Sequence, residues 1–324
     1  MSFHAKLKLA EVARHLSSPP YTYICSSSFE DRCLSIASQV DPDVVSRALI
    51  CMNEDMRDVV SRNDARLHEK FGKKAVSIIL RTDDPLLSAD GIQKGLAERT
   101  PGDTRKYLVD ITTFTHEGLL ILLNLLRQHA IPGDSALFAY NPADDYGVGM
   151  EEGDKWLSKG IGEIRSVLGY PGRLRPSRKC HLIVLVGYEV ERAGMLIDAY
   201  EPAVVSLGLG ALEESVSKNL YVLNEMFHQR LKDKLENVYE FPFSCVNHVE
   251  ARTSIERQSR VFEGYNVVVA PMNTKISSVG AATAAFSDES IQLCYAQAQQ
   301  YNHECYSTPS DQCYLFDAQD VLGK

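Results

Sequence analysis

A short apolar run that ends in a polar turn and leads into a helix occurs twice in this chain. The first copy is residues 107–115, with a helix predicted over 116–128. The second copy is residues 267–275, followed by a helix rich in small residues. Asp110 and Ala270, at equivalent places, are 160 positions apart (270 − 110). Since a strand feeding a helix is the basic step of an α/β sheet, the chain is predicted to contain two copies of one α/β unit.

Other matches between the halves occur in the same order. An aromatic residue and a glutamate, followed closely by an arginine, come after the first strand of each half, at residues 29–32 and 188–192. The fifth strands run into the pattern Tyr-x-x-Ala-x-x-Tyr, which begins at Tyr140 and again at Tyr295. Because the offsets stay between 155 and 160 positions, an internal duplication is favoured over two unrelated α/β halves.

The alternation of strands and helices predicts two tandem Rossmann-like units, each a doubly wound and mainly parallel sheet in which strand one neighbours strand four. We expect a first unit over residues 1–145 and a second over 177–324. A segment rich in glycine, proline and charge, residues 146–176, is interpreted as a connector.

Local patterns add three expectations. A helix is predicted over residues 5–16, and a second over 57–71 that Gly72 ends. The tail from Asn302 through residues 314–316 is expected to add an edge strand to the second sheet.

Composition limits the class of protein. Of 324 residues, 44% are hydrophobic and 24% charged, which is typical of a globular chain, and the net charge of −9 does not favour general binding to duplex nucleic acid. The N-terminus has no signal-peptide pattern, and the longest apolar segment, residues 118–126, is too short to span a membrane. We therefore expect a cytoplasmic location.

The cysteines and histidines give no metal pattern. The eight cysteines lack Cys-x-x-Cys spacing and fall partly in strand-like runs, so buried free thiols are predicted in place of disulfides. The nine histidines form no ligand spacing. Neither a metal nor another cofactor is implied.

In a doubly wound sheet, ligands bind beyond the carboxyl ends of the strands where the strand order reverses. The turns after strands one and four of each half meet there, and they precede helices whose free N–H groups attract anions. The predicted ligand-binding residues are those with polar or charged groups in these turns, together with a glycine: Ser26, Ser28, Glu30, Arg32, Asp110, Thr112, Thr113, Thr115, Gly187, Tyr188, Glu189, Arg192, Asn273, Thr274, Lys275 and Ser278.

Lys275 and the hydroxyl and amide side chains around it are most typical of a phosphate or nucleotide site, and the small residues at 280–282 allow close backbone approach. The alternative is that serine and threonine only cap the helix. The Glu–Arg pairs after the first strands are either site groups or local pairs that organise the turn. Asp110 either belongs to the site or caps its own turn. No Walker loop and no Gly-x-Gly-x-x-Gly motif is present.

Residues 110–115, residues 271–278 and the turns after the first strands resemble the CARF family of Rossmann-like cyclic-oligonucleotide sensors. Their tandem arrangement is similar to SAVED domains, in which two such units are fused. The resemblance implies a nucleotide sensor that signals to an effector or co-encoded enzyme, in a setting such as prokaryotic antiviral defence.

Three functions stay open on the sequence. The first is binding of a nucleotide or similar phosphorylated ligand in a cleft between the two lobes, with signalling to a protein partner. The second is a nucleoside or nucleotide hydrolase in which Glu30, Asp110 or Glu189 acts as acid or base. The third is a structural adaptor whose lobes form a partner interface. We expect no membrane association in any of these cases.

Overall fold

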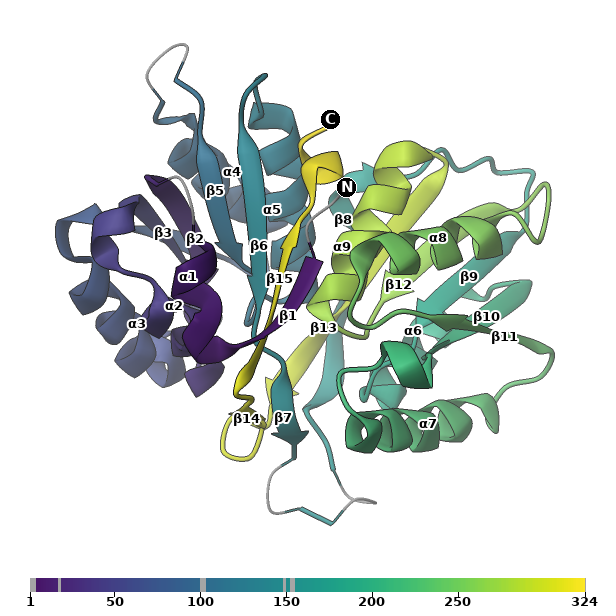
Figure 1. The fold of residues 1–324 in the computed structure, drawn as a ribbon. Coiled ribbons are helices and arrows are strands. Elements are labelled where there is room, and N and C mark those ends of the chain that lie inside the picture. Colours follow the sequence, from purple (N-terminus) through teal and green to yellow (C-terminus); the bar gives the residue numbers. More distant parts are fainter. Residues whose placement is uncertain (1–3, 17–18, 100–102, 148–149, 152–154, 324) are drawn as a thin grey trace. The chain divides into compact units, whose positions relative to one another are not determined.

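The computed structural model describes residues 4–16, 19–99, 103–147, 150–151 and 155–323. The chain divides into two compact units (Figure 1). Unit 1 comprises Met1–Val148 together with Ser307–Lys324, and unit 2 comprises Gly149–Tyr306. Each unit is built on a mainly parallel sheet, which confirms the predicted α/β class with two Rossmann-like sheets.

Unit 1 contains a seven-stranded sheet with the order β1-β15-β6-β5-β2-β3-β4, and a separate pair formed by β7 and β14. Five adjacent strands pair in parallel, while β15 pairs antiparallel with both β6 and β1. The strands are β1 (His4–Lys8), β2 (Tyr21–Ser26), β3 (Val45–Asn53), β4 (Ala75–Leu80), β5 (Lys106–Asp110), β6 (Ser135–Tyr140), β7 (Ala143–Tyr146), β14 (Ser307–Pro309) and β15 (Gln312–Asp317).

Helices pack against both faces of this sheet. The first three supply apolar side chains to one core, against side chains of β2, β3 and β15, and α4 and α5 contact each other on the other side. The helices are α1 (Val12–His15), α2 (Ser35–Gln39), α3 (Arg57–Phe71), α4 (Pro85–Ala97) and α5 (His116–His129).

Unit 2 contains a six-stranded sheet with the order β11-β10-β9-β12-β13-β8, in which β8 alone runs antiparallel. Helices α6 and α7 contact each other, as do α8 and α9. The elements are β8 (Ser158–Pro171), β9 (Cys180–Leu185), α6 (Val190–Tyr200), β10 (Val204–Gly210), α7 (Lys218–Lys232), β11 (Val238–Phe243), α8 (His248–Ser259), β12 (Asn266–Pro271), α9 (Lys275–Ser287) and β13 (Ile291–Tyr301).

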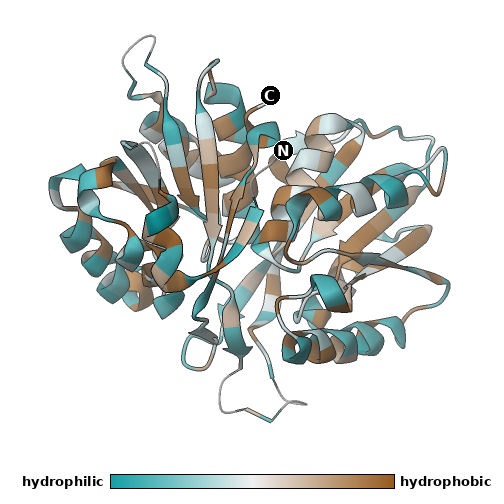
Figure 2. Ribbon diagram, viewed as in Figure 1, coloured by the Kyte–Doolittle hydropathy of each residue, from teal (hydrophilic) through white to brown (hydrophobic). Residues whose placement is uncertain are grey.

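The five parallel strands have the same order in both units: third, second, first, fourth, fifth along the sheet. Strand one pairs with strand four in each case, as β2 with β5 and as β9 with β12, which confirms the predicted neighbourhood. The central strands are the most apolar parts of each unit (Figure 2). Because parallel strands here are covered on both faces, their apolar runs are continuous.

The chain ends differ from the sequence prediction. The predicted helix over residues 5–16 is wrong for its first part, because His4–Lys8 alternates in exposure and pairs with β15 as an edge strand. The predicted place of the tail is also wrong: β15 lies in the first sheet, between β1 and β6 (Figure 1). By contrast, α3 has the predicted bounds, and Gly72 ends it with a φ of 52°.

The segment predicted as a connector contributes to unit 2. Residues 158–171 form β8, which pairs with β13, while residues 148–149 and 152–154 of this segment lie outside the described part. Unit 2 accordingly begins before residue 177, and the last 18 residues of the chain belong to unit 1. Among the described residues, no helix combines the length and apolar character needed to cross a membrane. All eight cysteines are free thiols; six are buried, and Cys180 and Cys305 are half-buried.

Candidate functional site

The turns after strands one and four meet within each unit. In unit 1, the Thr113 hydroxyl donates to the carbonyl oxygen of Ser26 at 2.7 Å. In unit 2, the Asn273 side-chain amide donates to the carbonyl oxygen of Val186 at 2.6 Å. Thr113 and Asn273 are 160 positions apart (273 − 113), as are the two acceptors. The structure therefore brings together the turns that the sequence predicted to be neighbours.

A glycine is required where the two turns of unit 2 meet. A Cβ atom placed on Gly187 would lie 2.0 Å from the carbonyl oxygen of Met272. The neighbouring backbone leaves no room for any side chain at this position.

Asp110 ends β5 in a fully buried position in unit 1. One carboxylate oxygen accepts from the Tyr23 hydroxyl and the other from the backbone N–H of Thr112, both at 3.0 Å. Burial raises the pKa of Asp110 to about 6, against the lowering effect of the hydrogen bonds from Thr112 and Tyr23. The carboxyl group thus caps its own turn, as the second reading of this residue predicted.

The raised pKa of Asp110 predicts a pH-dependent stability. Between about pH 4 and 6 the folded chain binds this proton more tightly than the unfolded chain, so the free energy of unfolding falls as pH rises. Asp110→Asn removes the titration. The stability of the natural chain relative to the variant is expected to drop by about 3 kcal/mol across this window. Urea unfolding at several pH values checks it, and a constant difference between the chains contradicts it.

Glu30 and Arg32 form a buried ion pair, with the nitrogen and oxygen 2.7 Å apart. The Arg32 guanidinium also donates to the carbonyl oxygen of Asn141 and to the Ser307 hydroxyl, both at 3.1 Å, and Ser307 donates to Glu30 at 2.5 Å. Burial lowers the pKa of Arg32, but Glu30 together with Tyr146 and Tyr140 raises it, and the net pKa lies well above its usual value. We call this network clasp 1.

An equivalent network, clasp 2, surrounds Arg192 in unit 2. Arg192 pairs with Glu189 at 2.6 Å, and it donates to the Ser158 hydroxyl at 3.3 Å and to the carbonyl oxygen of Ala296. Ser158 in turn donates to Glu189. Burial lowers the pKa of Arg192, but Glu189 together with Tyr295 and Tyr301 raises it, so that the net pKa is raised and the guanidinium stays charged. In both clasps the predicted Glu–Arg pair binds groups of its own unit.

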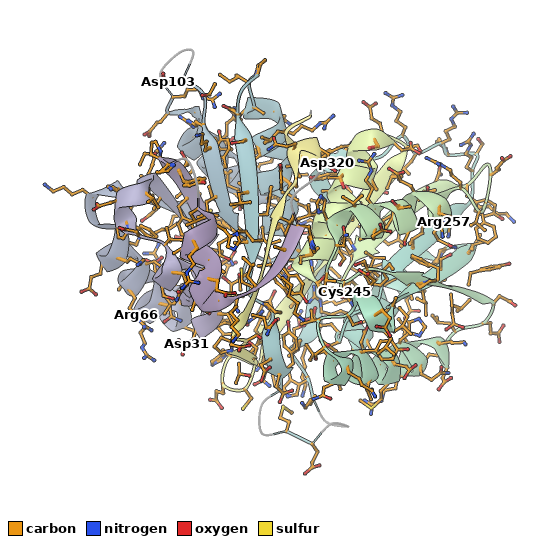
Figure 3. All side chains as sticks on the ribbon, viewed as in Figure 1. Asp31, Arg66, Asp103, Cys245, Arg257 and Asp320 are labelled. Atoms are coloured by element: carbon orange, nitrogen blue, oxygen red, sulfur yellow. The ribbon has the colours of Figure 1, made fainter. Side chains whose placement is uncertain are left out.

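Clasp 1 lies just inside the surface of unit 1. Asp31, the next residue after Glu30, is exposed and lies on the same side of the unit as Arg66 of α3 (Figure 3). The amide of Asn63 on α3 donates to Asp31 at 3.3 Å and to the carbonyl oxygen of Ser28 at 3.0 Å. The turn that carries the clasp is therefore also held by α3.

The first turn of α9 carries Lys275, the cation predicted for a phosphate site. Thr274 caps this helix by accepting from the backbone N–H of Ser277 at 3.2 Å, and its hydroxyl donates to the carbonyl oxygen of Cys245 at 2.6 Å. Lys275 is the first residue of the helix and is partly exposed. The first turn contains no acidic residue. A lysine beside the positive end of a helix dipole favours an anion here.

Gly280, the glycine of α9, has another role than predicted. A Cβ atom on Gly280 would lie 2.7 Å from Cβ of Ala251 and 2.8 Å from the carbonyl oxygen of His248, both on α8. Gly280 thus permits close packing of two helices, and the expectation of backbone approach to a ligand at 280–282 is wrong.

The other predicted site residues lie as follows. Thr115 caps α5 by accepting from the N–H of Gly118 at 3.0 Å, and Thr112 accepts from the N–H of Asn141. The Tyr188 hydroxyl donates to Leu220 on α7. Ser278 is fully buried within α9. Thr115 and Thr274 therefore each cap the helix that follows them.

Several participants were not among the predicted residues. Asn141, which lies between β6 and β7, holds the start of β15, because its side-chain amide donates to the carbonyl oxygens of Ser310 and Gln312. Asn224 of α7 donates to Val186 at 3.0 Å and supports the turn after β9. Ser158 and Ser307 complete the clasps from distant parts of the sequence, where no local pattern marks them.

Known proteins offer likenesses in fold. No family model matches the chain, and no curated protein sequence matches it. Three similar solved structures are the cytoplasmic domain of a prokaryotic cation chloride cotransporter (9% identity, 88% of this chain and 98% of that chain, TM-score 0.26), a type III CRISPR defence DNA nuclease activated by cyclic oligoadenylate (9%, 81% and 63%, TM-score 0.47), and a phosphoethanolamine N-methyltransferase of Haemonchus contortus (6%, 95% and 90%, TM-score 0.25).

These likenesses assign neither a family nor a function. The chain spans 63% of the nuclease chain, and all three TM-scores are below 0.5. Fold and strand-end geometry together define a class: a chain of two α/β units with Rossmann-like strand order, each with joined turns at strands one and four.

Proposed function

We propose that unit 2 binds a nucleotide or similar phosphorylated ligand at the ends of β9 and β12 and signals this to a protein partner. The observation that carries the proposal is Lys275 in the first turn of α9, beside the joined turns of strands one and four. Free N–H groups and one cation at a helix N-terminus suit a phosphate group. The partner and the setting in prokaryotic antiviral defence rest on the resemblance of the turns to CARF and SAVED proteins.

Unit 1 is less suited to an anion at the same place. Asp110 occupies the end of β5, and the first turn of α5 contains Glu117. Two carboxyl groups near the N-terminus of α5 oppose a phosphate group there. A site shared by both units stays a prediction of the sequence.

The geometry favours binding over hydrolysis. Glu30 and Glu189, two of the three candidate acids or bases, are each held by an arginine, with side-chain exposures of 8% and 11%. Asp110 is 2% exposed, and both of its oxygens already accept hydrogen bonds. A general acid or base has to reach its substrate within hydrogen-bond distance, directly or through one water.

Isothermal titration with a panel of nucleotides and cyclic oligonucleotides tests the proposal. Lys275→Ala is expected to weaken binding about 10- to 150-fold, the effect of losing one hydrogen bond to a charged group. Lys218→Ala is the matched control, because Lys218 is also the first residue of a helix in unit 2 but lies in α7. The proposal is contradicted if no nucleotide of the panel binds, or if the Lys275→Ala and Lys218→Ala variants bind with equal affinity. If no nucleotide binds but a pull-down yields a stable protein complex, an adaptor function is favoured.

A further inference from the structure

Both units have an antiparallel strand next to their fifth parallel strand, and we call it the closing strand. In unit 2 it is β8, which pairs with β13. In unit 1 it is the segment 307–317, whose strands β14 and β15 pair with β7 and β6. The two closing strands come from opposite ends of their units in sequence: β8 precedes the parallel strands of unit 2, and segment 307–317 follows everything else.

The closing strands are equivalent in register. Ser307 is paired with Tyr146, and Ser158 is paired with Tyr301. These tyrosines hold the same place, the last, in the two copies of Tyr-x-x-Ala-x-x-Tyr. Each closing strand therefore places a serine opposite the last tyrosine of the motif.

The clasps bind the closing strands in the same way. Ser307 and Ser158 are the serines to which Arg32 and Arg192 donate. The backbone carbonyl that each arginine binds belongs to the residue after the first tyrosine of the motif, Asn141 in one unit and Ala296 in the other.

Each arginine also lies over a tyrosine of its motif. The guanidinium carbon of Arg32 is 5.6 Å from the ring centroid of Tyr146, and that of Arg192 is 5.7 Å from the ring centroid of Tyr295. The strands, the serines and the carbonyls thus correspond between two sequences that share only short patterns, while the arginine lies over the last tyrosine of the motif in unit 1 and over the first tyrosine in unit 2.

Chain order shows where each closing strand comes from. β8 follows β6 and β7 of unit 1 in the sequence but pairs in unit 2. Segment 307–317 follows β13 of unit 2 but pairs in unit 1. β8 therefore follows the fifth strand of unit 1, with β7 between them, and segment 307–317 directly follows the fifth strand of unit 2.

We propose that the chain is a duplicated module in which the two halves have exchanged their closing strands, each held by an arginine clasp, and that this exchange couples the folding of the two units. Unit 2 is thereby an insertion between two parts of unit 1. When unit 2 is unfolded, residues 149–306 form a long flexible loop inside unit 1, and folding of unit 1 has to bring the two ends of this loop together at a cost in chain entropy. In return, a folded unit 1 holds both ends of unfolded unit 2 and so reduces the conformational entropy of that unfolded segment. The coupling acts equally in both directions.

The first and last strands lie close enough for a circular permutant that restores each closing strand to the same continuous stretch of chain as the rest of its unit. His4 is paired with Phe316, so the first and last strands are neighbours in unit 1 (Figure 1). A circular permutant that joins Lys324 to Met1 through a short Gly/Ser linker and begins at Ser307 makes each unit a continuous stretch. In this permutant both units have the closing strand first, followed by the five parallel strands.

Fluorescence of Trp156, the only tryptophan, tests the coupling because this residue lies in unit 2. Leu315→Ala weakens unit 1, since Leu315 in β15 is fully buried. In the natural chain the Trp156 denaturation midpoint is expected to fall by the same amount as the midpoint followed by circular dichroism. In the permutant, Leu315→Ala is expected to leave the Trp156 midpoint unchanged.

Leu293→Ala in β13, fully buried in unit 2, is the control and is expected to shift the Trp156 midpoint in both chains. Ser307→Ala serves as a milder second variant if Leu315→Ala does not fold. A Trp156 midpoint that stays unshifted in the natural chain overturns the proposal. So does an equal shift in both chains, or a permutant that does not fold.

Discussion

A chain that ends at Tyr306 is expected to lose the folded structure of unit 1. Removal of the last 18 residues removes β15, which lies between β1 and β6 in the sheet, so that β1 loses its neighbour and β6 loses one of its two. Six larger apolar side chains that stabilise unit 1 by burial are also removed, at about 1.5–3 kcal/mol each: Cys313, Tyr314, Leu315, Phe316, Val321 and Leu322. The total of roughly 10 to 15 kcal/mol matches the whole stability of an ordinary domain.

Hydrogen–deuterium exchange with mass spectrometry measures this loss. Backbone amides of β5 and β6 are expected to exchange slowly in the full chain and within seconds in the truncated chain. A chain that lacks only Gly323 and Lys324 is the control, because it keeps β15. Slow exchange in β5 and β6 after truncation at Tyr306 would mean that β15 is dispensable.

Arg32→Met is expected to lower the free energy of unfolding by about 3–5 kcal/mol, because it leaves the buried Glu30 without its counter-charge. Adding Glu30→Gln is expected to restore part of the loss, since the remaining buried group is then neutral. Guanidinium chloride unfolding measures both effects.

Arg66→Met is the matched control for this substitution. Arg66 is exposed on α3 (Figure 3), and its replacement is expected to change stability by no more than about 0.5 kcal/mol. If Arg32→Met and Arg66→Met are equally stable, clasp 1 is not the stabilising contact that its geometry indicates.

The parallel strands could be predicted from the sequence because their signal is local. Apolar runs such as Val267–Val269 lie between two layers of helices, so each run carries its own pattern. Strand one lies beside strand four in a Rossmann-like doubly wound sheet, the commonest of the few topologies that the handedness of crossovers leaves. The bounds of α3 followed from its charge spacing and from Gly72.

The edge and closing strands could not be predicted, because their pairing is not local. His4–Lys8 is five residues long and half exposed, and only its partner β15, some 300 positions away, makes it a strand. The 14 residues of β8 contain glycines and charges that are typical of a connector. Nothing near residue 307 in the sequence indicates which sheet it joins.

The site was predicted in part for the same reason. Residues that directly follow a strand can be recognised as site candidates from their position in the sequence, and these include Thr113, Asn273 and the Glu–Arg pairs. Tyr140 and Tyr295 were read as a sign of duplication, while their contact with the arginines needs the fold. The role of Gly280 could not be predicted, because the sequence does not distinguish a glycine that lets a ligand approach the backbone from one that lets another helix pack closely.

The most direct test of the proposed site is hydrogen exchange of the full chain with and without the nucleotide that binds most tightly in the titration. Slower exchange is expected at residues 187–190 and 273–277, the turns at the ends of β9 and β12. Unchanged exchange in both turns while the nucleotide is bound contradicts the proposed site.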